Sequence, residues 1–262
     1  MLYKRFIRDM KKYFSFSIIS AKSQLKSEVA NSYLNWLWWI LTPTCFMLIY
    51  TFIFGYVFKA KEPFFPIFIF IGISMWDFFN RMVNSSVKIV KNNKPIISKV
   101  YLPKYVLILI KTWVNGFKMI ISFGIVFVMM IVCQVPLTWN ILYFVPIVIL
   151  LMIFSFACSV YLLHYGVFIE DLSNVITILM RMVFYLTGIF YNVATRIPEP
   201  YGKLLIRYNP IAFFLESMRN ALLYGKTPHL KWMFVWFIIS LILSCLGIRK
   251  IYLNENSYVK VI

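Results

Sequence analysis

The chain has 262 residues, of which 61% are hydrophobic and only 14% are charged, with 27 Lys and Arg against nine Asp and Glu. Soluble domains average about 45–50% apolar and about 25% charged residues, so this composition excludes a soluble globular enzyme. The 19% of aromatic residues excludes a disordered chain. The sequence therefore predicts an integral membrane protein. Its net charge of +18 is expected to face anionic lipid head groups and not nucleic acid.

Residues 1–30 predict a basic amphipathic helix. Apolar residues such as Phe6, Met10 and Phe14 recur at four-residue steps, while Lys and Arg fill most of the positions between them. A helix of this kind lies along a membrane surface. No small-residue cleavage site follows, so we expect the segment to be retained and to lie on the cytoplasmic face.

Six apolar stretches are long enough for the roughly 20 residues that a membrane helix needs. They predict spans at about 36–58, 64–86, 106–133, 140–165, 174–193 and 231–251. Lys and Arg gather before the first span, between the second and third, and after the last. The loop between spans 1 and 2 has only Lys59 and Lys61, and the loop between spans 3 and 4 has none. The positive-inside rule therefore places both termini in the cytoplasm.

Residues 194–230 break the alternation of spans and loops. They lie on the predicted outer side, yet they carry five basic residues, and their apolar stretches are too short to span. Four prolines interrupt them. This pattern predicts re-entrant or interfacial helices, with a structured outer loop as the alternative.

Two inner loops could contact a soluble partner. The loop at about 87–105 can form one short helix between Pro95 and Pro103, whose apolar residues fit a groove on another protein. The loop around Glu170 and Asp171 is acidic, against the positive-inside trend. We expect these loops to supply a coupling surface. Its residues are Lys94, Pro95, Ile96, Ile97, Lys99, Val100, Glu170 and Asp171.

Charged residues inside predicted spans are costly and usually functional. Lys111 and Lys118 share one helix face, Lys111 near the cytoplasmic end and Lys118 deeper. Arg181 has no acid nearby in sequence, and Asp77, midway along the second span, is a plausible partner for one of these cations. Two interpretations stay open for Lys118 and Arg181: structural pairing, or an aqueous route that accepts an anion.

Phe46 and Tyr50 lie at helical spacing within the first span. They could offer a sliding surface to sugar rings, or they could simply pack against lipid or neighbouring helices. With Lys118 and Arg181 they form the candidate substrate path.

Signals for catalysis or metal binding are scarce. Gly225-Lys226-Thr227 imitates the end of a phosphate-binding loop, but Asn220 stands where that motif requires a glycine. The two histidines, His164 and His229, lie in unrelated segments, and no CxxC occurs. The cysteines, far apart in apolar runs, are Cys45, Cys133, Cys158 and Cys245. We therefore expect no catalytic residues, no metal site and no disulfide framework.

Several motifs in order resemble one family. They are Ser32-Tyr33-Leu34-Asn35-Trp36-Leu37-Trp38-Trp39 followed by Pro43, the Lys94-to-Pro103 loop, Glu170-Asp171-Leu172-Ser173-Asn174, Thr187-Gly188-Ile189-Phe190-Tyr191, Asn209-Pro210 and Arg219. Together they resemble the permease subunits of ABC-2 type exporters of polysaccharides, the O-antigen, capsule and teichoic-acid branch. The resemblance covers nearly the whole chain. Glu170-Asp171 departs from the Arg-Asp that members often have, which removes a cation from the expected motor contact.

The resemblance implies an all-α membrane permease in the cytoplasmic membrane of a bacterium, with an interface helix at 1–30 and a six-span domain at 31–262. It implies a homodimer with two copies of a separate subunit that binds ATP and Mg, and no cofactor in this chain. The implied cargo is a lipid-linked anionic glycan. One alternative is a membrane-embedded transferase acting on a polyprenyl-linked sugar, which would have only Asp77, Glu170 and Asp171 as catalytic groups. A passive channel is disfavoured because no repeated filter or polar stripe occurs.

Overall fold

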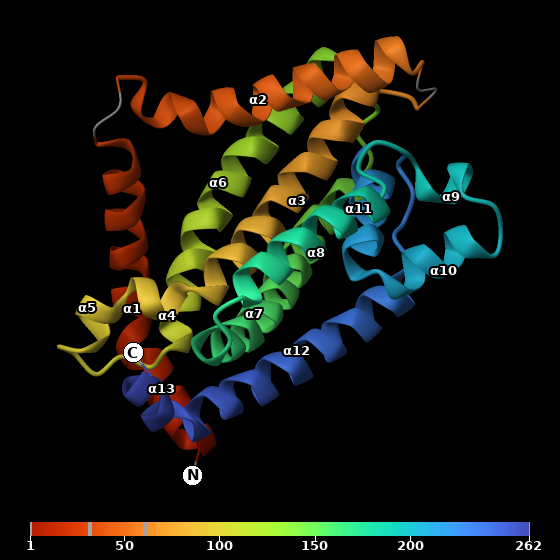
Figure 1. Ribbon diagram of the computed structural model, residues 1–262. Helices are drawn as coiled ribbons and strands as arrows, with labels where there is room; N and C mark the ends of the chain where they lie inside the picture. The colour runs from red at the N-terminus through yellow and green to blue at the C-terminus, as the bar shows by residue number, and fades with distance from the viewer. Residues whose placement is uncertain (1, 31–32, 60–61, 262) are drawn as a thin grey trace.

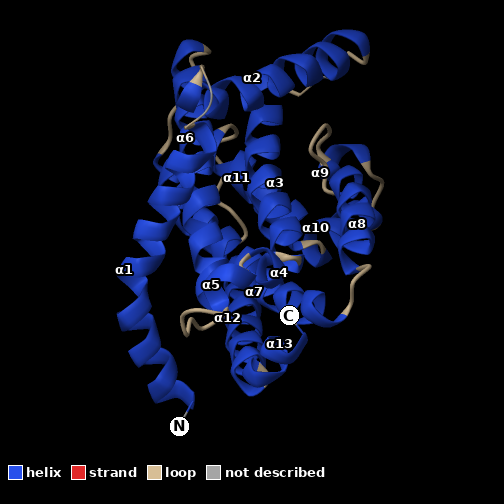
Figure 2. Cartoon of the chain, turned by 60° about the vertical axis from the view of Figure 1, so that its left-hand side comes forward, coloured by secondary structure: helices blue, strands red, loops and turns tan. Residues whose placement is uncertain are grey.

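The computed structural model describes residues 2–30, 33–59 and 62–261, and within these ranges it is helical with no strand (Figures 1 and 2). Its longer helices are α1 (Leu2–Val29), α2 (Trp38–Tyr50), α3 (Phe65–Val87), α6 (Tyr105–Val132), α7 (Phe144–Phe168), α8 (Leu172–Leu186), α11 (Pro210–Leu222) and α12 (Leu230–Leu253). The shorter ones are η1 (Asn35–Leu37), η2 (Thr51–Val57), α4 (Ile89–Asn92), α5 (Lys94–Ile97), η3 (Trp139–Tyr143), α9 (Val193–Arg196), α10 (Tyr201–Tyr208) and α13 (Glu255–Val261). The prediction of an all-α membrane protein is confirmed.

Among the residues that the structure describes, five helical segments are long and apolar enough to cross a membrane: Asn35–Val57, Phe65–Val87, Tyr105–Val132, Trp139–Phe168 and Leu230–Leu253. They correspond to five of the six predicted spans. The π-helical turn of η2 continues α2, so that these two elements form one span.

The predicted span at 174–193 is wrong at its C-terminal end, because the helix there ends at Leu186. The helix in this place, α8, has 15 residues, which at about 1.5 Å per residue is shorter than the roughly 30 Å of a bilayer's hydrocarbon core. The apolar run continues past Leu186, but the backbone turns at Gly188, whose φ is +73°. Glycine adopts this left-handed conformation without steric cost, so the helix ends there although the hydropathy does not.

Helix α3 is the centre of the bundle, and most of its residues are buried. It packs against α6, α7, α8 and α11, and α12 packs against the far side of α7 (Figure 1). A helix whose sequence is apolar without interruption is favoured to be buried on several sides. The core of the protein therefore runs along α3 and α7.

A helix forms at the predicted place, as α1, and it packs along α6. Its position along a membrane surface stays a prediction. The rings of Phe6 and Tyr105 lie 5.6 Å apart, and those of Phe14 and Trp113 lie 5.8 Å apart. Lys11, Lys12, Lys22 and Lys26 are exposed. The helix thus binds the bundle through one face and presents a basic face outward.

The region at 194–230 is largely helical, as α9, α10 and α11. Asn209 caps α11, because its side-chain oxygen accepts hydrogen bonds from the backbone N–H groups of Ile211 (3.1 Å) and Ala212 (3.2 Å). Pro210 begins the helix, where its missing N–H costs nothing. Helix α11 is buried against α3 and α7 and is part of the core, whereas most residues of α9 and α10 are exposed. The depth of this region in a membrane stays a prediction.

Both described chain ends lie at one end of the bundle, together with α4, α5 and α13 (Figure 1). We refer to this as the terminal end. Helix α2 instead crosses α6 and α3 near the opposite end, and most of its side chains are exposed or partly exposed.

Candidate functional site

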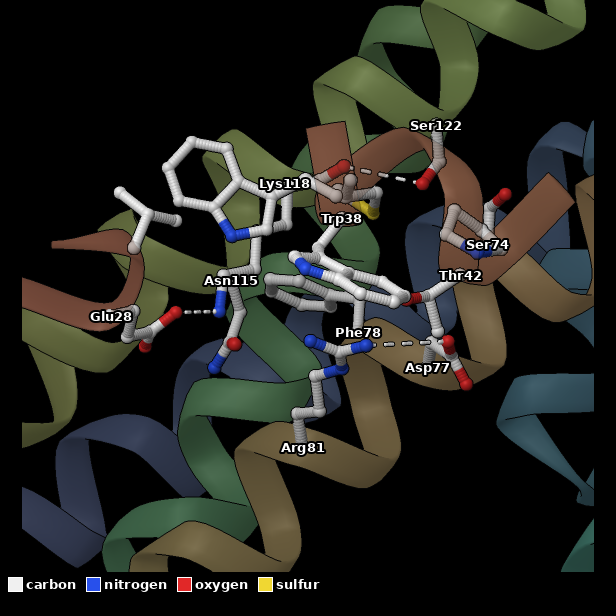
Figure 3. A pocket seen from close by; sticks show the side chains of 14 residues that line it. Glu28, Trp38, Thr42, Ser74, Asp77, Phe78, Arg81, Asn115, Lys118 and Ser122 are labelled. Carbon is white, nitrogen blue, oxygen red and sulfur yellow. Dashed lines mark hydrogen bonds and ion pairs between the residues drawn. The ribbon is translucent and has the colours of Figure 1, made fainter. Parts of the chain in front are cut away.

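A polar pocket of about 280 Å³ lies where the end of α1 meets α2, α3 and α6 (Figure 3). Trp38, Trp39 and Phe78 contribute aromatic walls. The polar lining consists of Glu28, Thr42, Ser74, Asp77, Arg81, Asn115, Lys118 and Ser122. A cavity with this lining, set among apolar helices, is the kind of place where membrane proteins hold polar cargo or ions.

The ion pairs of this pocket differ from the predicted ones. Lys118 donates a hydrogen bond to the Glu28 carboxylate at the end of α1, and Arg81 Nη2 lies 3.7 Å from Asp77 Oδ2 on the same helix (Figure 3). The prediction that Asp77 pairs with Lys118 or Arg181 is therefore wrong. Asp77 and Arg81 are four residues apart and share a helix face, whereas Glu28 reaches Lys118 only because α1 folds back along α6.

Arg181 lies in a second, more open groove of about 590 Å³ between α3 and α8. Asn80, Asn84 and Thr177 line the same groove. Asn84 donates a hydrogen bond to Asn80 Oδ1 (2.7 Å), and the Thr177 hydroxyl donates to Asn84 Oδ1 (3.4 Å). Within the described part of the chain Arg181 has no acidic partner, and its side chain is exposed. This groove offers a single uncompensated cation beside amide and hydroxyl groups.

The predicted aromatic residues of the first span form a row along α2 and η2. The rings of Phe46 and Tyr50 stack with centroids 6.2 Å apart, and Tyr50 lies 6.4 Å from Phe54. Phe190, in the turn after α8, contacts the row through Tyr50 (4.9 Å) and Phe54 (4.3 Å). The sequence predicted Phe46 and Tyr50 as path residues, and it gave no sign that Phe190, more than 130 positions away, would join them.

Arg219 of α11 is fully enclosed, with 2% of its surface exposed. Its guanidinium donates to the carbonyls of Gly188 (2.7 Å), Ile189 (2.8 Å) and Phe68 (3.1 Å), and it lies 3.4 Å from the centre of the Phe68 ring. A Cβ atom on Gly72 would lie 2.8 Å from Arg219 Nη2, so glycine makes room for the guanidinium. Arg219 thus ties the turn at Gly188 to α3. The resemblance singled out this residue, but nothing in the sequence assigned it this role.

The two predicted coupling loops meet at the terminal end. Lys91 Nζ of α4 lies 3.3 Å from Glu170 Oε1, which joins the first loop to the second. The other predicted residues of the second loop and of α5 lie on the surface: Asp171, Lys94, Pro95, Ile96, Lys99 and Val100 are exposed. Ile97 is half-buried against the core. The predicted short helix between Pro95 and Pro103 is limited to α5, Lys94–Ile97, because Ser98, Lys99 and Val100 form a turn and bend.

A polar cluster joins the first predicted coupling loop to both α1 and α13. Arg5 donates a hydrogen bond to Glu255 (2.6 Å) and another to the hydroxyl of Tyr101, which belongs to the loop. Burial and the nearby Glu255 carboxylate raise the pKa of Tyr101 to about 12. The Tyr13 hydroxyl donates to the Tyr101 carbonyl (3.1 Å). These hydrogen bonds therefore hold the loop against the N-terminal helix.

Among the residues that the structure describes, no group of three or more His, Cys, Asp or Glu side chains could hold a metal ion. The carbonyl of Gly225, in the Gly225-Lys226-Thr227 segment that imitates a phosphate-binding loop, accepts a hydrogen bond from the Asn140 side chain. Its backbone is thus engaged within the protein.

Comparison with known proteins gives a family and several relatives. The family model described as ABC-2 type transporter matches residues 18–223. The chain is 25% identical to the O-antigen export system permease protein RfbA of Myxococcus xanthus over 91% of this chain and 92% of the relative. It is 25% identical to RfbA of Klebsiella pneumoniae over 90% of each chain. It is also 25% identical to the polysialic acid transport protein KpsM of Escherichia coli, over 77% of this chain and 79% of the relative.

The matched residues take in α2, α3, α6, α7, α8 and α11, and hence both pockets, the aromatic row, Arg219 and the two coupling loops. The chain belongs to the ABC-2 type transporter family.

Proposed function

We propose that the chain is the permease subunit of an ATP-driven exporter that carries a lipid-linked polysaccharide across the bacterial inner membrane. The observation that carries this proposal is the similarity, over nine-tenths of both chains, to permeases named for O-antigen export. The similarity to a polysialic acid transport protein extends the proposed cargo class to capsule-type glycans. We also propose teichoic acid as a member of the cargo class.

The proposed energy source is a separate ABC nucleotide-binding subunit, present in two copies, which binds ATP and Mg. The coupling surface supports this division of labour, because the exposed side chains of Ile96 and Val100 offer apolar contacts at the terminal end. The basic residues of that end support a cytoplasmic location for it and for both termini by the positive-inside rule. This chain itself is proposed to have no enzymatic step.

The proposed working unit is a homodimer whose two copies enclose the path of the glycan. Exposed apolar side chains along α2 and α8 support an intramembrane partner or lipid on these helices. The proposed path includes the aromatic row at Phe46 and Tyr50, which suits sugar rings, and the groove of Arg181, whose uncompensated cation suits a diphosphate head group. Lys118 borders the path but its charge is already matched by Glu28.

The transferase alternative gains no support. Its three candidate acids do not come together, because Asp77 pairs with Arg81 within the bundle while Glu170 and Asp171 are exposed on the terminal end. The relatives that match over most of their length are named as transport proteins.

The proposed function is tested in the source bacterium by deleting this gene and restoring it with or without an ATPase-competent nucleotide-binding subunit. Loss of surface glycan, with accumulation of lipid-linked glycan in the inner membrane, is expected on deletion. Recovery is expected only when the partner hydrolyses ATP. Unchanged surface glycan after deletion, or recovery with an inactive partner, would overturn the proposal.

A further inference from the structure

The pocket between α1, α2, α3 and α6 has an unusual charge balance. Two carboxylates, Glu28 and Asp77, face two cations, Lys118 and Arg81, and each cation already has its own carboxylate partner. A bound phosphate would find no free cation and would meet two negative groups. The pocket is therefore poorly suited to an anion, in contrast to the Arg181 groove.

A neutral hydroxyl suits this lining better. A hydroxyl group both donates and accepts, so it can donate to a carboxylate and accept from the cation paired with it. Asn115 adds an amide with both functions, and Thr42 and Ser122 add further hydroxyls. Several such groups around one small cavity match a ligand that carries hydroxyls on several sides.

The hydroxyl of Ser74 provides a separate observation. It is buried at the edge of this pocket and, among the described residues, it has no hydrogen-bond partner. Buried polar groups are nearly always satisfied, and an orphan that lines a cavity indicates a partner supplied from within it. The Ser122 hydroxyl, by comparison, donates to the Lys118 carbonyl (3.2 Å).

The remaining walls are aromatic. Trp38 enters from the start of α2 and Phe78 from α3 (Figure 3). Trp39, the next residue of α2, also lines the pocket. Flat apolar faces beside polar groups suit the ring of a sugar, which has C–H bonds on its faces and hydroxyls at its rim. The volume of about 280 Å³ is at the small end of ligand pockets, which limits the occupant to about one ring.

We propose that this pocket binds a single neutral sugar ring of the exported glycan, held by the Glu28–Lys118 and Asp77–Arg81 pairs and by Ser74. The inference rests on the proposed function, because only an exporter of glycans would meet such a ligand here. It separates two parts of the cargo: a sugar ring in this pocket, and the anionic head group at the groove on the other side of α3.

The test measures equilibrium binding of tritiated hexyl glycosides of glucose, galactose, rhamnose and N-acetylglucosamine to the full chain in lipid nanodiscs with its nucleotide-binding partner. Saturable binding of at least one glycoside is expected. Ser74→Ala should weaken it by about two- to twelvefold, the value of one hydrogen bond, and Asp77→Asn by more than about tenfold. Inorganic pyrophosphate should not compete.

Ser159→Ala is the matched control, because Ser159 of α7 is also a buried hydroxyl with no partner in the described structure but lies outside the pocket. Its binding should equal that of the unmodified protein. Ser74→Ala removes no contact within the protein, so it keeps the test decisive even if Asp77→Asn fails to fold.

Absence of binding by all four glycosides, binding that Ser74→Ala leaves unchanged, or competition by pyrophosphate would each overturn the proposal. Surface glycan of the same strains is measured in parallel. Normal export without glycoside binding would overturn the sugar-binding proposal alone. Glycoside binding in a protein that exports no glycan would overturn the proposed function but not the sugar-binding proposal.

Discussion

The rings of Phe54 and Phe190 stack almost in parallel, with centroids 4.3 Å apart and planes inclined by 10°. Phe54 belongs to the π-helical end of the first span, and Phe190 to the turn that follows α8. Aromatic pairs of this kind are worth about 0.5–1.5 kcal/mol beyond the area they bury. The pair joins the partly exposed end of the first span to a turn that is itself buried, at Thr187, Ile189 and Phe190. It therefore helps to hold the end of the first span against that turn.

Replacing Phe190 with Leu should loosen this junction while preserving the apolar core. We expect glycan export to fall several-fold at a normal amount of membrane protein, since the aromatic row loses its contact with the α8 turn. Surface glycan is measured against protein level by immunoblot. Phe234→Leu, an exposed aromatic position on α12, serves as control, and equal export by both variants would contradict the expectation.

Arg219 should be essential for stability. Arg219→Met leaves the carbonyls of Gly188 and Ile189 without their buried donor, which costs about 1–3 kcal/mol for each unsatisfied group. A large drop in the thermal unfolding temperature in detergent is expected. Arg196→Met, on the exposed surface of α9, should have almost no effect. Similar unfolding temperatures for the two variants would show that Arg219 does not hold the turn.

The Lys118 ion pair gives a double-mutant test. Lys118→Met should destabilise the protein by about 1 kcal/mol, because it leaves the partly buried Glu28 carboxylate unpaired. Adding Glu28→Gln should recover most of this loss, whereas adding Asp77→Asn should not. Chemical or thermal unfolding of these three variants and of the unmodified chain measures the rescue. Rescue by Asp77→Asn would instead support the pairing of Asp77 with Lys118 that the sequence suggested.

The coupling surface can be altered without disturbing the bundle. Ile96 and Val100 are 49% and 59% exposed, so their replacement with Asp should leave the fold intact. A carboxylate in an apolar groove of the partner is costly unless paired, so the ATPase subunit should bind weakly and export should fail. Co-purification of the ATPase subunit with the chain measures the loss of binding. Ile97→Asp, at a half-buried site, should instead lower the amount of folded protein.

Alkaline pH should weaken the polar cluster around Arg5. The folded-state pKa of Tyr101 is raised to about 12, above its ordinary value near 10, so the folded chain holds this proton more tightly than the unfolded chain. The corresponding stability is present below about pH 10 and is lost as the pH rises toward 12. Unfolding temperatures from pH 9 to 12 should fall more steeply for the unmodified chain than for Tyr101→Phe. Parallel curves would exclude the effect.

Apolar run length predicted most of the fold, because five runs of sufficient length became five long helices. It failed at the end of α8, where Gly188 and the distant Arg219 decide the turn although the sequence there stays apolar. Hydropathy is a property of neighbours in sequence and cannot register a hydrogen bond between residues 31 positions apart.

The same limit applied to the candidate site. Lys118 and Arg181 could be selected as charges within spans, and Phe46 and Tyr50 by their helical spacing, but the partners of these residues could not be predicted. Glu28 meets Lys118 across 90 positions, and only the direction in which α1 folds back decides that contact.

The hydrogen bond between Arg5 and Glu255 has a consequence for biosynthesis. Translation runs from the N-terminus, and Glu255 follows Arg5 by 250 residues, so the helix made first waits for nearly the whole chain before it acquires this partner. In a chain stalled before Glu255, Arg5, which also contacts Tyr101 of the loop, would lack its hydrogen bond to Glu255. The hydrogen bond between Arg5 and Glu255 can therefore form only after α13 has been translated, so α1 gains this contact late in synthesis.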